Sequence, residues 1–304
     1  MATPETEYGF VDVDGARLYY EVTGSGRPLV LVHGLLIDRR LWDEQVPVFA
    51  ARHRVIRYDA RGYGASPMEQ PGQWPGTDMA DLLALLDALQ IDRAYLLGLS
   101  MGGETVHAFT IAHPERVAAL IEVGSGAAGW ESTPEFEAQW NPFWAAAANG
   151  EHERARELFM RVWVDGAWGQ AAPALRERAR AIMAGYQFGH FKPAPAPPAA
   201  EESGDTGAAE PASAPGDAET PAPEATSAAP AEDESAQLAR IHVPALIMVG
   251  ERDQPGAIHA AEVMAAGIPG ARKVIIPGAA HIVPLEQPAA FNAAVLDFLD
   301  SLPA

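Results

Sequence analysis

The sequence contains no cysteine among its 304 residues. Disulfide bonds and thiolate metal ligands are therefore excluded, and this composition fits a reducing compartment. No run approaches the roughly 18 to 20 apolar residues that a membrane-spanning helix needs, and residues 1–7 lack the basic and apolar regions of a secretion signal. We therefore expect a cytoplasmic protein that neither crosses nor binds a membrane.

Basic residues are scarce, since two lysines (Lys192 and Lys273) and nineteen arginines stand against 41 acidic residues, giving a net charge of −20. Nucleic acids and anionic membranes are bound by clustered Lys and Arg side chains that neutralise phosphate. A nucleic-acid partner is therefore not expected. The His, Asp and Glu residues also show no metal-ligand spacing, so the sequence predicts no metal site.

Hydrophobic residues make up 48% of the chain, which is enough for a large α/β domain with a substantial core. Apolar runs alternate with amphipathic segments, the pattern of parallel strands joined by crossover helices. The expected strands are 10–13, 18–22, 29–32, 55–58, 94–97, 117–123, 245–249 and 273–276, and the expected helices are 39–52, with a kink or break at Pro47, 78–89, 104–113, 256–266 and 289–302. This predicts an eight-stranded, mostly parallel sheet between helices. The hairpin signal Asp14-Gly15 makes the second strand its one antiparallel member.

One serine stands at a sharp turn between an expected strand and an expected helix, in Gly98-Leu99-Ser100-Met101-Gly102. Glycines two residues before and two after leave room for the backbone to close, and G-x-S-x-G is the pattern of a nucleophile elbow. The alternative is a tight turn with an incidental serine. The flanking strand and helix favour Ser100 as a nucleophile.

A serine nucleophile needs a base within hydrogen-bond reach and a third group that orients the base. Asp253 follows the seventh expected strand and His281 follows the eighth, so both belong to the sheet edge that carries Ser100. Asp253 is alternatively a turn or helix-cap residue, with Glu251 as a rival acid. The histidines expected at the surface or in helices are His53, His107, His113, His152, His190, His242 and His259.

Attack by Ser100 would leave negative charge on the former carbonyl oxygen, which preorganised N–H donors stabilise. The amide of Met101 lies at the positive end of the helix after Ser100. The amide of Leu35 follows the third strand, where Gly34 allows close approach. We expect these two amides to form an oxyanion hole and His33 to shape the turn by hydrogen bonding.

These motifs together resemble the α/β-hydrolase family over about 10–126 and 238–302. The matching residues are His33-Gly34, Asp59-x-Arg61-Gly62-x-Gly64-x-Ser66, Gly98-x-Ser100-x-Gly102-Gly103, Asp253 and Gly278-x-x-His281. Within the family, the segments 39–45, 57–62 and 98–103 resemble the 3-oxoadipate enol-lactonase-like and carboxylesterase-like branch. The resemblance implies an α/β-hydrolase fold with a helical cap after strand six, no cofactor and an acyl-enzyme mechanism.

The domain organisation follows from composition. Residues 1–126 and 238–304 are expected to form the catalytic domain and residues 127–192 the helical cap. The segment 193–237 has nine prolines, ten acidic residues and no basic, aromatic or large aliphatic residue, so we expect a disordered insert. In the cap, Trp130, Trp140, Trp144 and Trp163 either pack the helices together or line an apolar pocket above Ser100.

The sequence therefore predicts a serine hydrolase that cleaves a small-molecule ester or lactone with an apolar acyl part, as a monomer or homo-oligomer. An anionic lactone would require a cation near the pocket, which Arg39 or Arg40 could supply unless both are solvated helix residues. The alternatives are a non-hydrolytic ligand receptor or scaffold of the same fold, a cofactor-free perhydrolase and a C–C bond hydrolase.

Overall fold

The computed structural model describes residues 5–68, 78–166, 169, 171–191 and 234–303. Its centre is an eight-stranded sheet with the order β1-β2-β4-β3-β5-β6-β7-β8. The strands are β1 (Thr6–Val13), β2 (Ala16–Thr23), β3 (Arg27–Val32), β4 (His53–Tyr58), β5 (Ala94–Leu99), β6 (Val117–Val123), β7 (Ala245–Gly250) and β8 (Arg272–Ile276). Strand β2 pairs antiparallel with β1 and β4, and the other pairs are parallel. The predicted sheet and its one antiparallel member are confirmed.

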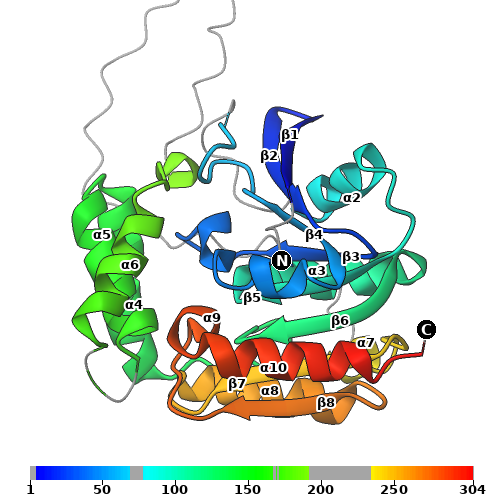
Figure 1. The fold of residues 1–304 in the computed structure, drawn as a ribbon. Helices are drawn as coiled ribbons and strands as arrows, with labels where there is room; N and C mark the ends of the chain where they lie inside the picture. The colour runs from blue at the N-terminus through cyan, green and yellow to red at the C-terminus, as the bar shows by residue number, and fades with distance from the viewer. Residues whose placement is uncertain (1–4, 69–77, 167–168, 170, 192–233, 304) are drawn as a thin grey trace, which may run out of the picture.

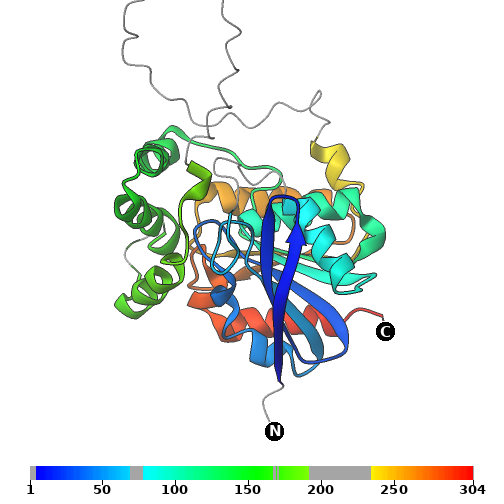
Figure 2. The ribbon, with the colours of Figure 1, turned by 90° about the horizontal axis from the view of Figure 1, so that it is seen from above.

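Helices cover both faces of this sheet. The α-helices are α1 (Val46–Phe49), α2 (Asp78–Ala88), α3 (Met101–Ala112), α4 (Pro134–Ala148), α5 (His152–Phe159), α6 (Pro173–Met183), α7 (Glu234–Leu238), α8 (Pro255–Gly267), α9 (Val283–Glu286) and α10 (Pro288–Asp300). Shorter segments are η1 (Arg39–Trp42), η2 (Pro114–Arg116), the π-helical η3 (Met160–Val164) and η4 (Gly189–Phe191). Helices α2, α3 and α8 lie on one face, and α1 and α10 on the other (Figure 2).

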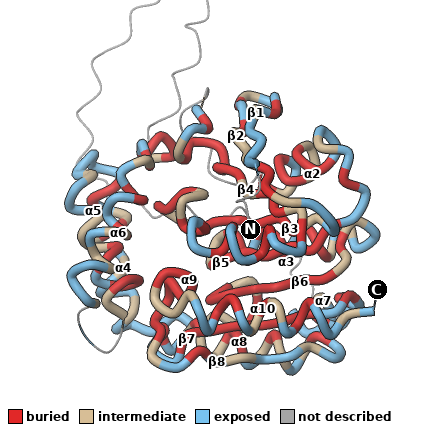
Figure 3. The backbone as a smooth tube through the Cα atoms, in the orientation of Figure 1, coloured by how far each residue is buried: buried red, intermediate tan, exposed pale blue. Residues whose placement is uncertain are grey.

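The central strands are the most deeply buried part of the molecule (Figure 3). Every residue of β5 and of β7 is buried, as expected for parallel strands covered on both faces. Helices α4, α5 and α6 stand together beside one edge of the sheet (Figure 1). None of the helices in the described parts of the chain has the length and apolar character needed to cross a membrane.

The helical segment expected over 39–52, with a break at Pro47, consists of two short segments, η1 and α1. Asp38 caps η1 by accepting a hydrogen bond from the Arg40 amide, and Pro47 stands in the first turn of α1. Proline lacks an N–H donor and its ring crowds the preceding turn, so it begins a helix more readily than it continues one. Pro47 therefore interrupts the predicted helix.

His53 was expected at the surface or in a helix, and that expectation is wrong. It begins strand β4 and is 8% exposed, paired with Arg27 of β3 and packed near the ring of Tyr95. Its position on the inner strand of a covered sheet removes it from water. His107 lies on α3 as a helix residue, but it is buried against Glu122.

The predicted disordered insert, 193–237, falls mostly outside the described residues. Its last four residues, 234–237, are helical and belong to α7, which corrects the predicted boundary. The Glu234 carboxylate accepts a hydrogen bond from the Gly129 amide at 3.0 Å. Leu238, at the end of the helix, is 1% exposed and packs against Gly267 of α8. The hydrogen bond accepted by Glu234 and the burial of Leu238 therefore hold α7 against the rest of the domain.

Candidate active site

Ser100 stands between the end of β5 and the start of α3 with φ 53° and ψ −119°. A non-glycine residue rarely adopts a positive φ, because its Cβ crowds the backbone. The turn closes because its flanking positions lack Cβ atoms: one on Gly98 would lie 2.1 Å from the Gly102 carbonyl oxygen, and one on Gly102 would lie 2.4 Å from that of Val32. The strained turn presents the serine side chain at the edge of the sheet.

His281 lies in the loop between β8 and α9, and Asp253 lies between β7 and α8. The imidazole Nδ1 is 2.9 Å from Oδ1 and 3.0 Å from Oδ2 of Asp253. Both side chains are buried, at 5% exposure for His281 and 0% for Asp253. The rival acid, Glu251, instead accepts a hydrogen bond from the Gly278 amide at 2.9 Å. The structure therefore pairs His281 with Asp253 and not with Glu251.

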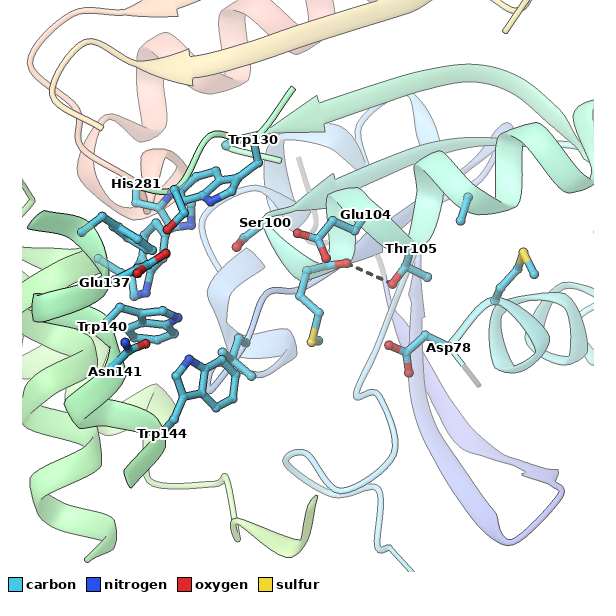
Figure 4. A pocket seen from close by; sticks show the side chains of 18 residues that line it. Asp78, Ser100, Glu104, Thr105, Trp130, Glu137, Trp140, Asn141, Trp144 and His281 are labelled. Atoms are coloured by element: carbon cyan, nitrogen blue, oxygen red, sulfur yellow. Dashed lines mark hydrogen bonds between the residues drawn. The ribbon is translucent and has the colours of Figure 1, made fainter. Parts of the chain in front are cut away.

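Ser100 and His281 line the same cavity, which has a volume of about 850 Å³ (Figure 4). The cavity lies between the sheet edge and the helices that follow β6. The structure thus brings Ser100, His281 and Asp253 from three distant parts of the chain to one place. A proton on Nδ1 directed at the carboxylate leaves Nε2 unprotonated, which is the tautomer a general base requires.

Gly124 is a contributor that the sequence analysis missed. It follows β6 with φ +55°, and a Cβ there would lie 3.0 Å from Nδ1 of His281 and 3.2 Å from Oδ2 of Asp253. Contacts this short would push the pair out of position. A glycine directly after an expected strand was the available signal, because this is the edge where the other site residues lie.

The two predicted oxyanion-hole residues, Leu35 and Met101, both line the cavity. The turn carrying Leu35 is held by His33, whose Nε2 accepts a hydrogen bond from the Ala60 amide at 3.0 Å. Its Nδ1 is 2.9 Å from the Gly34 carbonyl oxygen, so Nδ1 carries the proton and donates. Burial lowers the pKa of His33, which keeps the ring neutral. His33 fixes the turn as predicted.

All four predicted tryptophans line the cavity, and they also contact one another. Trp140 lies with its ring centroid 5.5 Å from that of Trp144 and 5.4 Å from that of Trp163, and Trp130 lies 6.1 Å from Trp163. The four tryptophans therefore both pack against one another and line the cavity, so the two roles that the sequence suggested are not exclusive. Trp163 lies in the π-helical segment η3, which the sequence analysis did not foresee.

Arg39 and Arg40 do not supply a cation to the cavity. Arg39 pairs with Glu21 at 2.8 Å and Asp59 at 2.6 Å, and Arg40 pairs with Asp38 at 2.6 Å. Neither is among the residues that line the cavity. Arg39 is 18% exposed, so the alternative of a solvated helix residue is also wrong for it. Carboxylates on β2 and after β4 therefore hold the Arg39 guanidinium, and the carboxylate before η1 holds that of Arg40.

Three acidic side chains line the cavity instead: Asp78, Glu104 and Glu137. Burial, together with the Asp81 carboxylate, raises the pKa of Asp78 to about 8. Burial and Glu122 raise the pKa of Glu104 to about 7. Glu104 lies four residues after Ser100, which places it one helical turn further along the same face. That spacing was a usable signal for Glu104, and the sequence analysis missed it.

Across the described parts of the chain, no three His, Asp or Glu side chains form a group that could hold a metal ion. The polar groups of the site include the Ser100 hydroxyl, the His281–Asp253 pair, the three acidic side chains, and the side chains of Thr105, Ser132 and Asn141. This set suits nucleophilic and acid–base chemistry.

A family model described as the alpha/beta hydrolase fold matches residues 27–162. Among solved structures, a hydrolase from Pseudomonas aeruginosa is 29% identical, with a TM-score of 0.71 over 97% of this chain and 99% of that one. The enol-lactonase from Burkholderia xenovorans is 23% identical, with a TM-score of 0.72 over 96% and 100%. A curated relative, the 2-hydroxy-6-oxononadienedioate/2-hydroxy-6-oxononatrienedioate hydrolase of Burkholderia vietnamiensis, is 38% identical over 41% of this chain and 46% of its own length.

The sheet order, the turn at Ser100 and these matches agree, and the chain has the α/β-hydrolase fold. The chain spans less than half the length of the curated relatives it matches. The enol-lactonase likeness, at 23% identity, concerns the fold.

Proposed function

We propose that the protein is a serine hydrolase that cleaves a carboxylic ester or lactone through an acyl-enzyme intermediate. The observation that carries this proposal is the His281–Asp253 pair, 2.9 Å between Nδ1 and Oδ1, at the cavity that Ser100 enters from a strained turn. A serine hydroxyl is a weak nucleophile at neutral pH, and an oriented imidazole is the group that activates it.

In the first half-reaction, Nε2 of His281 takes the proton of Ser100 as its oxygen attacks the substrate carbonyl carbon. The C–O bond to the leaving alcohol then breaks, and the imidazolium donates its proton to that oxygen. Asp253 holds the ring in the required tautomer and stabilises its positive charge. In the second half-reaction, His281 deprotonates a water that attacks the acyl-enzyme and releases the acid.

The tetrahedral intermediates carry a negative oxygen that needs donors already in place. The backbone amides of Leu35 and Met101 are assigned this role, since both residues line the cavity beside Ser100 and Met101 begins α3. Each such donor contributes roughly 10²–10³ in rate. No cofactor enters this scheme.

The substrate is assigned from the cavity walls. Indole rings of the segment 127–192, which acts as the cap over the catalytic domain, favour a small molecule with an apolar acyl part. The Burkholderia vietnamiensis relative is named for dioates, which carry two negative charges. The lining described here has three acidic side chains and no Lys or Arg, so an ester without a carboxylate suits this chain better.

The test is the release of p-nitrophenol from short-chain p-nitrophenyl esters by the purified protein. Steady release with many turnovers per molecule supports the proposal. A single burst without turnover, or binding without product, indicates a ligand receptor or scaffold of the same fold. Halide oxidation in acetate buffer with peroxide indicates a perhydrolase, and cleavage of β-diketones without ester turnover indicates a C–C bond hydrolase.

A further inference from the structure

The cavity has the carboxyl groups of Asp78 and Glu104 on one side, and indole rings together with the carboxyl group of Glu137 on the other. Figure 4 shows Asp78 and Glu104 on the sheet side and Trp140 and Trp144 across from them on α4. No Lys or Arg belongs to the lining within the described residues. The segments that the structure does not describe contain a single basic residue, Lys192. The described part of the lining therefore presents carboxyl groups and aromatic rings to a ligand, and no Lys or Arg.

Among these groups, Asp78 combines burial with an oxygen that lacks a hydrogen-bond partner. It is 8% exposed, and its Oδ1 has no hydrogen-bond partner among the described residues. The nearby guanidinium of Arg61 is engaged by Asp81, at 2.8 Å and 2.6 Å to its two carboxylate oxygens. A buried carboxyl oxygen without a partner is costly, because burial removes the water that would solvate it. A ligand that enters the cavity can supply the missing partner.

Glu104 is a second carboxyl group of this lining. No ion pair to Glu104 is found in the described parts of the chain, and the buried carboxylate of Glu122 behind it is bonded to His107 at 2.9 Å. The raised pKa values of Asp78 (about 8) and Glu104 (about 7) have the same cause, since burial and a neighbouring carboxylate oppose ionisation at both. Each group would be stabilised in its charged form by a cation in the cavity.

The opposite wall is suited to the same kind of ligand. A cation within about 6 Å of an indole face is attracted by the negative potential of the ring. Trp130, Trp140, Trp144 and Trp163 all contribute to the lining and hold one another at ring-centroid distances of 5.4 to 6.1 Å. Indole faces and carboxyl groups together stabilise an ammonium group whose substituents are apolar.

We infer that the cavity selects esters that carry an alkylated ammonium group, held between the carboxyl groups of Asp78 and Glu104 and the indole wall. This inference rests on the proposed ester hydrolysis and names the substrate class of the same site. The inference also excludes dianionic substrates, because the described lining has no Lys or Arg to neutralise their carboxylates.

The test compares three p-nitrophenyl esters of equal acyl length. One acyl chain ends in trimethylammonium, the second in the uncharged tert-butyl group of the same shape, and the third in a carboxylate. The ammonium ester is expected to exceed the tert-butyl ester in kcat/KM by about tenfold, with the carboxylate ester lowest. Turnover of the tert-butyl ester without preference for the ammonium ester overturns the inference and leaves the proposed hydrolysis standing. Failure of all three esters instead counts against the hydrolysis.

Binding of hexyltrimethylammonium, followed by tryptophan fluorescence, tests the inference without turnover. The indole emission is expected to change in a saturable manner with hexyltrimethylammonium and not with hexanoate. Saturable binding of this cation, together with a preference for the ammonium ester, supports the inference. No fluorescence change with the cation, together with equal kcat/KM values, overturns it.

Two substitutions locate the effect. The ratio of kcat/KM for the ammonium ester to that for the tert-butyl ester is expected to fall by about tenfold in the double variant Asp78→Asn, Glu104→Gln. The matched control, Glu135→Gln, removes an exposed carboxylate of α4 that is not part of this lining. An equal fall in the control would assign the preference to overall charge, and an unchanged ratio in the double variant would overturn the assignment to these two residues.

Discussion

The indole of Trp163 packs against the imidazole of His281, with ring centroids 4.2 Å apart and an interplanar angle of 42°. The same imidazole is hydrogen-bonded through Nδ1 to Asp253, so it is held by a carboxylate and by an aromatic ring. A general base displaced by about 1 Å loses much of its effect, on the order of 10²-fold. Trp163→Leu is therefore expected to lower kcat by about tenfold or more, because the imidazole gains freedom that Asp253 alone does not remove.

Kinetics on one neutral p-nitrophenyl ester check this prediction. A positioning role predicts a loss mainly in kcat and a slower reaction of Ser100 with a fluorophosphonate. Trp163→Phe keeps a ring in contact and should restore most of the rate. If Trp163→Leu raises KM and leaves both kcat and the labelling rate unchanged, Trp163 serves only as cavity lining.

Removal of the Ser100 hydroxyl should abolish covalent labelling of the protein by a fluorophosphonate, because the attacking oxygen is gone. Ser100→Ala adds no new backbone strain, since alanine and serine both place a Cβ at the φ of 53° found there. The matched control is Ser132→Ala, which removes a second serine hydroxyl from the same cavity. Labelling should persist in the control, and persistent labelling of Ser100→Ala would refute the nucleophile assignment.

A methyl group at Gly124 should disturb the His281–Asp253 pair directly. The added Cβ would stand 3.0 Å from Nδ1 and 3.2 Å from Oδ2, so Gly124→Ala is expected to lower kcat by about 10²-fold. It also places alanine at φ +55°, which costs roughly 1–2 kcal/mol of stability.

Gly150→Ala separates these two effects. Gly150 has φ +75° and no atom within 4 Å of the position of an added Cβ, so it carries the backbone strain without the contact. Both variants should melt at lower temperature, and only Gly124→Ala should lose kcat. Equal kcat values in the two variants would show that the pair tolerates the added methyl group.

The sequence predicts those site residues that stand in a short motif or directly after an apolar strand. Ser100 lies in a short motif between a strand and a helix, and Asp253 and His281 each follow an apolar strand directly. In a parallel sheet the strand ends meet at one edge, so chain order alone brings these three residues together. In the structure His281 contacts Asp253 at 2.9 Å, and Ser100 lines the same cavity as His281.

Glu104 and Gly124 had local signals in the sequence, but the place of Asp78 and the partners of Arg39 depend on how elements pack against one another. Asp78 reaches the cavity because α2 lies beside α3, and no spacing within the sequence encodes that approach. Arg39 was assigned to solvent or to the pocket, whereas Glu21 of β2 and Asp59 after β4 bind it. Such ion pairs join segments that become neighbours only when the sheet has formed.

Asp78 also predicts how stability depends on pH. Burial, and then the Asp81 carboxylate, raise the pKa of Asp78 from 3.8 to about 8. Between these values the folded chain retains a proton that the unfolded chain releases, so the contribution of Asp78 to stability falls as pH rises from about 4 to about 8. Asparagine cannot ionise, so Asp78→Asn lacks this loss. Its melting temperature should therefore exceed that of the wild type by a larger margin at pH 9 than at pH 5.

From pH 5 to pH 8 the loss spans about three pKa units at about 1.4 kcal/mol each, which is on the order of 4 kcal/mol. Thermal unfolding, followed by circular dichroism at pH 5 and at pH 9, measures this loss as the difference in stability between Asp78→Asn and the wild type. The control is Asp87→Asn, which removes an exposed carboxylate from the same helix and should keep a nearly constant margin. A margin for Asp78→Asn that is equal at pH 5 and pH 9 would mean that Asp78 is already ionised at pH 5. Asp78 would then not be the proton-holding group that the burial of its carboxyl implies, because the folded chain would retain no proton there.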